Sequence, residues 1–459
     1  MASSIDANKE TDEQQAGDLF VDFAVDQIDR CRNGLTTITA ASEAAAERIV
    51  SRHGQLLTAG DDSFTMEFVW AAGGIAFAKR WKPDLALNLQ EDPSALNTAV
   101  PYYQTADYEG QMYSRDVNSN DVVLLGYENE RLEQAHLEAY TNELLAANAC
   151  VILFASEGIA RDVQTRYGSR ENLILITHNV PDGGIIDVPG WPSKICSGRS
   201  FIQRLNLWVF QTELIGAFLR RGKMPGILLS VTYESPQIHN LPLIHSYRFV
   251  PAFDVTPVKE GELGETYLNA IRQILTSIIP GQRQKFRQGA QWMAEAIENG
   301  HKVFALLIHG VNPVDLPGDP HLFTVYVEGD AMYPELGKVC AKDDVALFLG
   351  YNWYPPELVE TVDAAEGKLI LCITTVQNQP PRPVMYGSQG PLLHVNSLEQ
   401  LPKRNSHIHI DEKWSEYDAV LKIPDYTVPA ASSSRPVLNV LYWHFVADTV
   451  ELLAKKKLS

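Results

Sequence analysis

The sequence predicts an α/β protein made of two tandem copies of one domain, each a parallel sheet of about five strands in a three-layer α/β/α arrangement. The first observation is a near-repeat, because an apolar strand that starts at Asp and stops at Gly-Tyr occurs at 121–127 and again at 344–351. In both copies a loop and a helix are expected to follow. The second observation is the alternation of predicted strands and helices, which is typical of a parallel sheet covered on both faces.

The elements of the first half have clear end signals. Residues 19–53 carry Ala, Glu and Arg at helical spacing, with a break at Gly34 and a stop at Gly54. A short strand then ends at Gly60, and residues 66–81, apolar on nearly all sides, predict a buried helix. After these come strands at 85–89 and 121–125, a helix at 130–149, strands at 150–155 and 173–177, an edge strand at 185–189 and a closing helix at 200–221.

The second half repeats this order of elements. Its predicted elements are a helical region at 265–299, strands at 302–308, 325–328, 345–349 and 369–374, a helix at 356–366, an edge strand at 419–424 and a final helix at 437–455. Segments 44–54, 187–190 and 207–213 match 290–300, 421–425 and 442–448 in the same order. Duplication is therefore predicted, with a disordered lead at 1–18, domains at 19–235 and 269–459, and a linker at 236–268.

Composition narrows the class of protein. The 459 residues are 45% apolar and 21% charged, as in globular proteins, and the net charge of −19 argues against nucleic acid or anionic membrane as the main partner. The five cysteines are scattered without CxxC spacing, which predicts free thiols in a reducing compartment, the cytoplasm. The sequence shows neither a signal peptide nor an apolar run long enough to span a membrane.

The order of elements resembles the sugar isomerase (SIS) domain family. The shared features are a long helix, two strand-Gly-loop-helix units, an edge strand reading Val/Ile-Pro-Gly/Asp, and a long closing helix such as 207–225. The resemblance covers nearly all of 19–235 and 269–459. It implies two SIS-like domains facing each other about a pseudo-twofold axis, as in phosphoglucose/phosphomannose isomerases and in the isomerase part of glucosamine-6-phosphate synthase. The closing helix is also similar to that of phosphoheptose isomerases.

The resemblance further implies where a ligand binds. In the family, Ser/Thr-rich loops after the first and middle strands cradle a sugar phosphate with backbone N–H groups and hydroxyls. The corresponding loops of this chain give the predicted ligand-binding residues, which are Gly60, Ser63, Thr65, Gly126, Asn129, His309, Gly310, Gly350 and Asn352.

These loops depart from the family pattern. Residues 60–65 and 126–131 each carry two carboxylates. A carboxylate about 4 Å from a phosphate opposes binding by about 4 kcal/mol, whereas a helix N-terminus favours an anion by only about 0.3–1 kcal/mol. Either the carboxylates point away as helix caps or the ligand is not a phosphate monoester. Ser63 and Thr65 are equally explained as caps, and Asn129 and Asn352 as Asx turns.

Two residues are candidates for acid–base chemistry. His444 stands on the final helix where the resemblance implies a proton-transfer histidine, and Glu67 follows the first loop as a possible carboxylate partner. The alternatives are a packing histidine between aromatic neighbours and a glutamate that compensates a helix dipole.

The chain is therefore expected to bind a phosphosugar or sugar derivative. Aldose–ketose isomerisation without a cofactor is the candidate activity, and a homodimer is the candidate assembly. The alternative is a non-catalytic sugar sensor or scaffold with a degenerate fold. His407 and His409 share a strand face with Asp411, but no third ligand is evident by spacing, so a polar strand face is favoured and no metal site is predicted.

Overall fold

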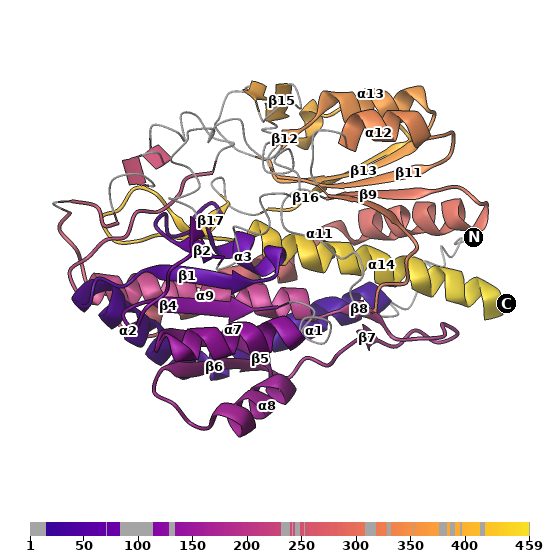
Figure 1. Ribbon diagram of the computed structural model, residues 1–459. Coiled ribbons are helices and arrows are strands. Elements are labelled where there is room, and N and C mark those ends of the chain that lie inside the picture. The colour runs from indigo at the N-terminus through magenta and orange to yellow at the C-terminus, as the bar shows by residue number, and fades with distance from the viewer. Residues whose placement is uncertain are drawn as a thin grey trace, which may run out of the picture.

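The computed structural model describes residues 15–69, 71–82, 113–127, 134–230, 239–240, 242–243, 248–251, 253–307, 318–327, 332–351, 353–375, 383–385, 391–394, 397–413 and 418–458. Two parallel sheets lie on opposite sides of a shared layer of long helices, which Figure 1 shows running through the middle of the molecule. All predicted ligand-binding residues except Asn129, His309, Gly310 and Asn352 fall within the described residues.

The first sheet has six parallel strands. In spatial order they are β3 (Tyr113–Ser114), β2 (Lys79–Trp81), β1 (Leu56–Gly60), β4 (Val122–Gly126), β5 (Cys150–Ser156) and β6 (Leu173–His178). Along β4, Val122 and Leu124 face the central helices, whereas Val123 and Leu125 pack toward α7 (Gln134–Ala146) and α8 (Glu157–Tyr167). This two-residue alternation is expected of a strand buried on both faces.

The second sheet repeats the first. It runs β10 (Thr324–Val327), β9 (Val303–Leu307), β11 (Val345–Leu349), β13 (Lys368–Ile373) and β16 (His407–Asp411), all parallel. Helices α12 (Met332–Val339) and α13 (Pro356–Ala364) lie on its outer side (Figure 1). The spatial order of the second sheet, β10-β9-β11-β13-β16, corresponds strand by strand to β2-β1-β4-β5-β6 of the first sheet. The predicted fold class, two helix-flanked parallel sheets, is confirmed.

Three predicted elements differ. The helix expected at 66–81 is wrong: α3 (Asp62–Val69) ends early and β2 starts at Lys79. Gly73, at φ +78°, breaks the helix, because its N–H binds Leu228 O and its carbonyl accepts from Ala431 N. The two edge strands do not join the main sheets. They form separate hairpins, β7 (Gly184–Ile186) with β8 (Ile195–Ser197) and β17 (Ala419–Leu421) with β18 (Ala430–Ser432).

The remaining described elements are peripheral. A small sheet holds β12 (Trp353–Tyr354), β15 (Pro391–His394) and β14 (Pro383–Met385), and a short helix, η2, spans Leu398–Gln400. The strand predicted at 85–89 lies outside the described residues.

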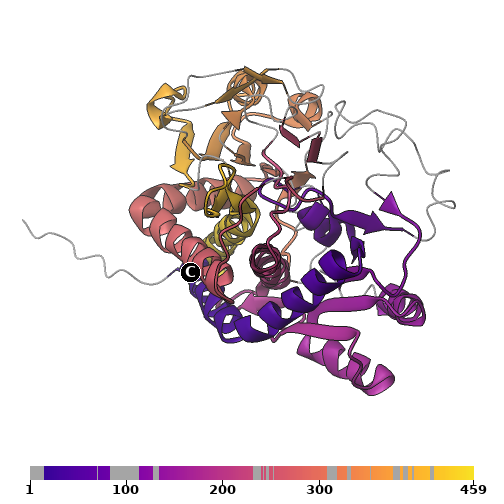
Figure 2. The same ribbon diagram turned by 90° about the vertical axis from the view of Figure 1, so that its left-hand side faces the viewer.

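Five helices form the central layer. They are α1 (Ala16–Asn33), α2 (Leu35–Ser51), α9 (Arg199–Arg220), α11 (Glu262–Glu298) and α14 (Ser434–Leu458). The break predicted at Gly34 separates α1 from α2, and α11 bends near Pro280, where Gln282 leaves helical geometry. Helix α11 starts inside the segment predicted as linker. The first helix of each half, here called its leading helix, packs against the closing helix of the other half. Thus α1 packs on α14, and the first part of α11 packs on α9. Figure 2 shows the indigo α1 beside the salmon α11.

Each leading helix begins against a buried carboxylate of the other half, and the two carboxylates occupy matching positions. Asp448 of α14 accepts a hydrogen bond from Gly17 N at the start of α1 (2.7 Å), and Glu213 of α9 accepts from Gly264 N (2.7 Å) and Gly261 N (2.9 Å) at the start of α11. Both carboxylates are 1% exposed. A carboxylate at a helix N-terminus satisfies orphan N–H groups and opposes the helix dipole. Glu213 and Asp448 are the last residues of the matching segments 207–213 and 442–448.

Helix α14 is long and apolar enough to cross a membrane by composition. However, 89% of its most apolar stretch is buried inside the protein, as in the core helix of a folded domain.

The crossing of α1 requires a glycine at position 17. A Cβ atom there would lie 2.7 Å from Asp448 Oδ1 and 2.8 Å from the His444 ring. We expect Gly17→Ala to lower the free energy of unfolding by about 1–3 kcal/mol, because the ring and carboxylate cannot both retreat in a packed layer. Thermal or chemical unfolding measures the effect. Gly158→Ala in α8, where a Cβ atom would lie 3.9 Å from Ser156 Oγ, is the matched control and should be neutral or stabilising. Equal stability of both variants would contradict the packing described.

Candidate functional site

The chain order defines one topological switch point in each sheet. From β1 the chain moves to β2 and β3 on one side and then returns to β4 on the other, so the switch point lies between β1 and β4. In the second sheet it lies between β9 and β11. Open α/β sheets bind ligands outside the carboxyl ends of the strands at this point. The predicted positions Gly60, Gly126 and Gly350 stand at these strand ends.

The first switch point is tightly closed by its glycines. Gly60 and Gly126 are paired in register, and a Cβ atom on Gly60 (φ +125°) would lie 1.8 Å from Gly126 O. A Cβ atom on Gly126 would lie 2.5 Å from the ring of Phe64. Both glycines therefore let the strand ends and α3 approach closely.

The hydroxyls predicted to bind ligand take part in helix capping. Asp61 Oδ1 accepts from Phe64 N (2.8 Å) and from Ser63 Oγ (2.9 Å), and Thr65 Oγ1 donates to Asp61 O (3.0 Å). The carboxylate of Asp61 thus acts as a cap for α3, one of the two alternatives that the sequence left open. Thr65 is buried, whereas Ser63 is half-buried.

The second switch point is also lined by buried groups. Gly350 is buried, and a Cβ atom there would lie 2.2 Å from the Phe348 ring. Tyr351 follows it and interacts with Arg435 in the first turn of α14. The predicted positions His309, Gly310 and Asn352 of this switch point, and Asn129 of the first, lie outside the described residues.

A buried charge cluster joins the two switch points. Glu67 of α3 is 0% exposed; its carboxylate pairs with Arg435 NH1 (3.0 Å) and Arg204 Nε (3.7 Å) and accepts from Trp208 Nε1 (2.5 Å). Although burial opposes the charged form, Glu67 and Tyr351 raise the pKa of Arg435 above its usual range. Arg435 therefore contacts α3 of the first half and Tyr351 of the second. Buried charges of this kind persist only when they are paired.

The start of α14 carries a second acidic group. Asp418 accepts from Ser434 N (2.7 Å), Ser434 Oγ (2.5 Å) and Ser432 Oγ (3.0 Å). Burial raises its pKa to about 6, although these hydrogen bonds and the charge of Arg435 oppose the rise. Tyr267 of α11 donates to Ser432 O (2.8 Å), so the leading helix of the second half also reaches this point.

Glu412, at the end of the edge strand β16, is a further buried acid. It directly follows β16 and is 0% exposed, and neither carboxyl oxygen has a hydrogen-bond partner among the described residues. Burial first, and then Asp411 and Asp418, raise its pKa well above the usual range. Burial without a hydrogen-bond partner thus disfavours the charged form of Glu412.

The two predicted acid–base residues are not brought together. His444 lies nine positions after Arg435 on α14, which is about 13 Å along the helix axis. Its ring lies between Asp18 (3.8 Å) and Asp448 (3.6 Å) and packs on Phe286 at 5.0 Å between centroids. The neighbouring His444 lowers the pKa of Asp18. His444 thus contacts α1 and α11 in the helical layer, and its predicted catalytic role stays a prediction.

The site residues predicted from the sequence did not include Arg204, Arg435, Asp418 or Glu412. For the two arginines, the sequence did contain a signal, a charged side chain within an otherwise apolar helix. Helices α9 and α14 bury almost every residue. Such a charge must find a partner inside the fold. The histidines of β16 serve structural contacts: His407 Nε2 lies 2.9 Å from Asp363 Oδ1, and no group of three or more metal-ligating side chains occurs in the described part of the chain.

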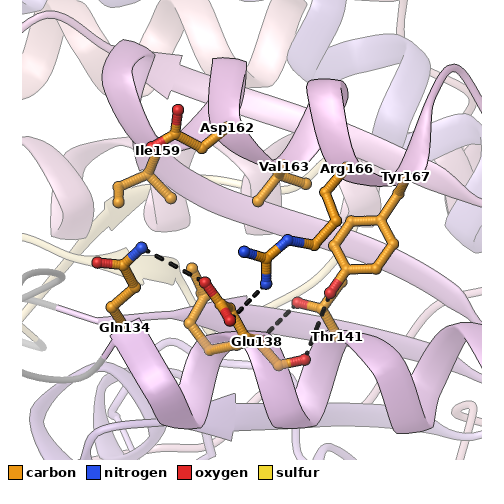
Figure 3. A pocket seen from close by; sticks show the side chains of 9 residues that line it. Gln134, Glu138, Thr141, Ile159, Asp162, Val163, Arg166 and Tyr167 are labelled. Atoms are coloured by element: carbon orange, nitrogen blue, oxygen red, sulfur yellow. Dashed lines mark hydrogen bonds and ion pairs between the residues drawn. The ribbon is translucent and has the colours of Figure 1, made fainter.

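A small hollow lies between α7 and α8. Figure 3 shows Arg166 of α8 reaching across it to Glu138 of α7, and Tyr167 donating to Glu138 O. Its volume of about 20 Å³ is close to what a single water needs. We assign it no ligand.

No family model matches the sequence, and no curated protein matches it. Solved structures with a similar overall fold include a proposed phosphosugar isomerase from Clostridium difficile (7% identity, TM-score 0.43, covering 95% of this chain and 93% of that one). They also include the C-terminal domain of glucosamine-fructose-6-phosphate aminotransferase from Francisella tularensis (9%, TM-score 0.39, 94% and 96%). A third is a proposed sugar-binding protein from Salmonella typhimurium (10%, TM-score 0.43, 94% and 98%). At TM-scores below 0.5, these likenesses decide neither the ligand nor the reaction of this chain.

The raised pKa of Asp418 predicts a pH effect on stability. Because the folded protein keeps this proton up to about pH 6 instead of 3.8, the stability it contributes is complete below about pH 3.8 and is lost as pH rises through 6. The loss amounts to about 3 kcal/mol, at about 1.4 kcal/mol per pKa unit. Unfolding of the wild type and Asp418→Asn between about pH 4 and 7 measures it.

The stability of the wild type relative to Asp418→Asn should fall by about 3 kcal/mol as pH rises through this range, since the variant has no proton to lose at this position. The exposed Asp162→Asn is the control and should run parallel to the wild type. Parallel curves for Asp418→Asn would contradict the assignment.

Proposed function

We propose that this protein binds a phosphosugar, or a closely related anionic sugar derivative, between the two facing switch points. The observation that carries the proposal is the position of Arg435, whose buried guanidinium contacts Glu67 beside the first switch point and Tyr351 at the second. Arginine is suited to phosphate because its planar fork donates paired hydrogen bonds. The position of this residue agrees with the rule that ligands bind at switch points.

The charges of the cluster support an anionic ligand. Glu67 is shared by two guanidiniums, those of Arg204 and Arg435. A phosphate that enters would compete with Glu67 for these donors. One of the two acidic residues of the first loop, Asp61, is engaged as a helix cap. This reduces the objection that acidic loops raise against a phosphate monoester.

The reaction class that we propose is aldose–ketose isomerisation. A base removes a proton from the carbon next to the carbonyl and returns it to the former carbonyl carbon, while the hydroxyl proton moves to the former carbonyl oxygen. No cofactor is consumed. Glu67 is proposed as the base, since a phosphate that takes over Arg435 would free its carboxylate. Binding without turnover would instead indicate a sugar sensor. We further propose the cytoplasm as the compartment, because all five cysteines are free.

Substitutions at Arg435 and Glu67 separate binding from chemistry. Arg435→Gln should weaken the binding of phosphosugars, measured by calorimetry, by about tenfold or more, because a charge-assisted hydrogen bond is lost. Glu67→Gln should keep or improve binding, since a competitor for the guanidiniums disappears, while turnover falls by about 100-fold or more.

Arg404→Gln is the matched control. Its side chain is 62% exposed and pairs with Asp363 at 3.5 Å, away from the cluster, so binding should not change. The double variant Glu67→Gln/Arg435→Gln replaces the buried ion pair by a neutral pair and keeps a folded reference if the single Arg435 variant is unstable. Failure of the wild type to bind any phosphosugar, or equal losses in the Arg404 variant, would refute the proposed function.

The predicted catalytic role of His444 needs a separate test. Because its ring lies between Asp18 and Asp448, we expect His444→Gln to lower the melting temperature and to change the turnover of the folded protein by no more than about twofold. Isomerase assays below the melting temperature provide the measurement. A loss of about 100-fold in turnover with an intact fold would instead establish His444 as an acid–base residue.

A further inference from the structure

A cavity of about 250 Å³ lies in the first half, away from both switch points. It is formed where α1 meets α2 at Gly34, beside the edge strand β6, the first residue of α8 and the second turn of α9. Strand β6 is the third strand from β1, about 14 Å away at the usual strand spacing. The cavity is more than ten times the volume of the hollow between α7 and α8 and is large enough for a small metabolite.

The floor of the cavity is polar and uncharged. Asn206 is 3% exposed and lines the cavity, and its amide has no hydrogen-bond partner among the described residues. Gln27 is 4% exposed, and its amide makes one hydrogen bond, to Asp26 (3.3 Å). Burial lowers the pKa of His178 to about 3, so its ring adds no charge. Buried amides normally find a partner, and here only the cavity can hold it.

The mouth carries one charge of each sign. Arg30 uses its Nε to bind Asp26 (2.7 Å), and its two NH2 groups have no partner in the described structure. Glu157 is exposed at the start of α8, and no ion pair of its carboxylate is found within the described residues. The walls are aliphatic, from Ile38, Ile176 and Ile202. A net-neutral ligand is therefore favoured over a phosphate or a metal ion.

The second half offers an internal comparison. Its corresponding helix break, at Pro280 in α11, is closed onto the corresponding edge strand, β16. Gln282 donates to Asp411 O (2.8 Å) and accepts from Asp411 N (2.9 Å), and Lys285 donates to His409 O (2.7 Å). These side chains bond the strand where the first half leaves the cavity open. The first copy has thus kept a polar space that the second copy fills with its own residues.

We propose that this cavity binds a free α-amino acid with an uncharged side chain. The α-carboxylate would pair with Arg30 and the α-ammonium with Glu157, while the side chain enters between the aliphatic walls toward the amides of Asn206 and Gln27. This arrangement uses the NH2 groups that Arg30 leaves free beside its bond to Asp26, pairs the carboxylate of Glu157, and gives the buried amides a partner.

The site is placed to regulate how the halves meet. Its lining includes Cys31 and Gly34, which flank Arg32, whose guanidinium binds Glu265 of α11 (2.9 Å). A ligand that spans the α1–α2 break would fix the angle between α1, which packs on the other half, and α2, which stays with its own half. Binding should therefore slow amide exchange at Gly17 and Gly264, where the crossing helices begin.

Calorimetry of the full chain with a panel of free amino acids, including glutamine and asparagine, tests the proposal. Saturable binding should weaken about tenfold or more in Arg30→Gln and in Glu157→Gln, two surface changes that leave the core intact. Asn206→Leu should weaken amino acids with polar side chains more than those with apolar ones. Glu171→Gln, an exposed carboxylate outside the cavity, is the matched control and should bind as the wild type does.

The double variant Glu67→Gln/Arg435→Gln, which removes both charges of the buried pair, should leave amino-acid binding unchanged, so this test is independent of the phosphosugar proposal. The absence of binding at millimolar amino acid, or equal affinity in all variants, would overturn the inference. So would free sugars that bind with the same dependence on Arg30 and Glu157.

Discussion

The architecture depends on two buried carboxylates, Glu213 and Asp448, each of which receives the first N–H groups of a helix from the other half. A carboxylate that is 1% exposed would be very costly without such donors, and the N–H groups at a helix start need acceptors. Each half therefore supplies the carboxylate that caps the leading helix of the other half. Because the two contacts match in sequence position and in partner, they also account for the pseudo-twofold arrangement.

The crossing of the helices determines where charge can be placed. Helices α9 and α14 are enclosed on all sides, by their own half and by the leading helix of the other. A charged residue on either helix has to pair inside the layer, and Arg204 and Arg435 do so with Glu67. Such a pair adds little net stability compared with apolar residues, but losing one partner typically costs about 3–5 kcal/mol. The cluster is thus better explained by the need for charge at the junction of the switch points than by stability.

Much of the fold could be predicted from the sequence, because strands buried on both faces are apolar runs that end at Gly and because the order of elements occurs twice. The helix expected at 66–81 failed, since local apolarity cannot show that the backbone of Gly73 bonds to residues 228 and 431, which are distant in the chain. The same limit applies to the site. Capping by Asp61 is local and was foreseen as an alternative, whereas the pairing of Glu67 with Arg435 joins residues more than 360 positions apart.

The two copies differ most where a helix break meets an edge strand, and the difference follows from the side chains available. In the second copy, Gln282 has one acceptor and one donor group, which match the N–H and C=O of Asp411, and the ammonium of Lys285 caps the carbonyl of His409. In the first copy, Thr37 and Arg30 stand beside the cavity and make no hydrogen bond to β6 among the described residues. An edge strand with unpaired backbone groups needs either protein or solvent against it. In the second half, the side chains of Gln282 and Lys285 cover the edge strand, and so the space at the helix break in α11 is closed. The first half leaves this place to a molecule that can exchange with solvent, at the point where one helix leaves its own sheet for the other half.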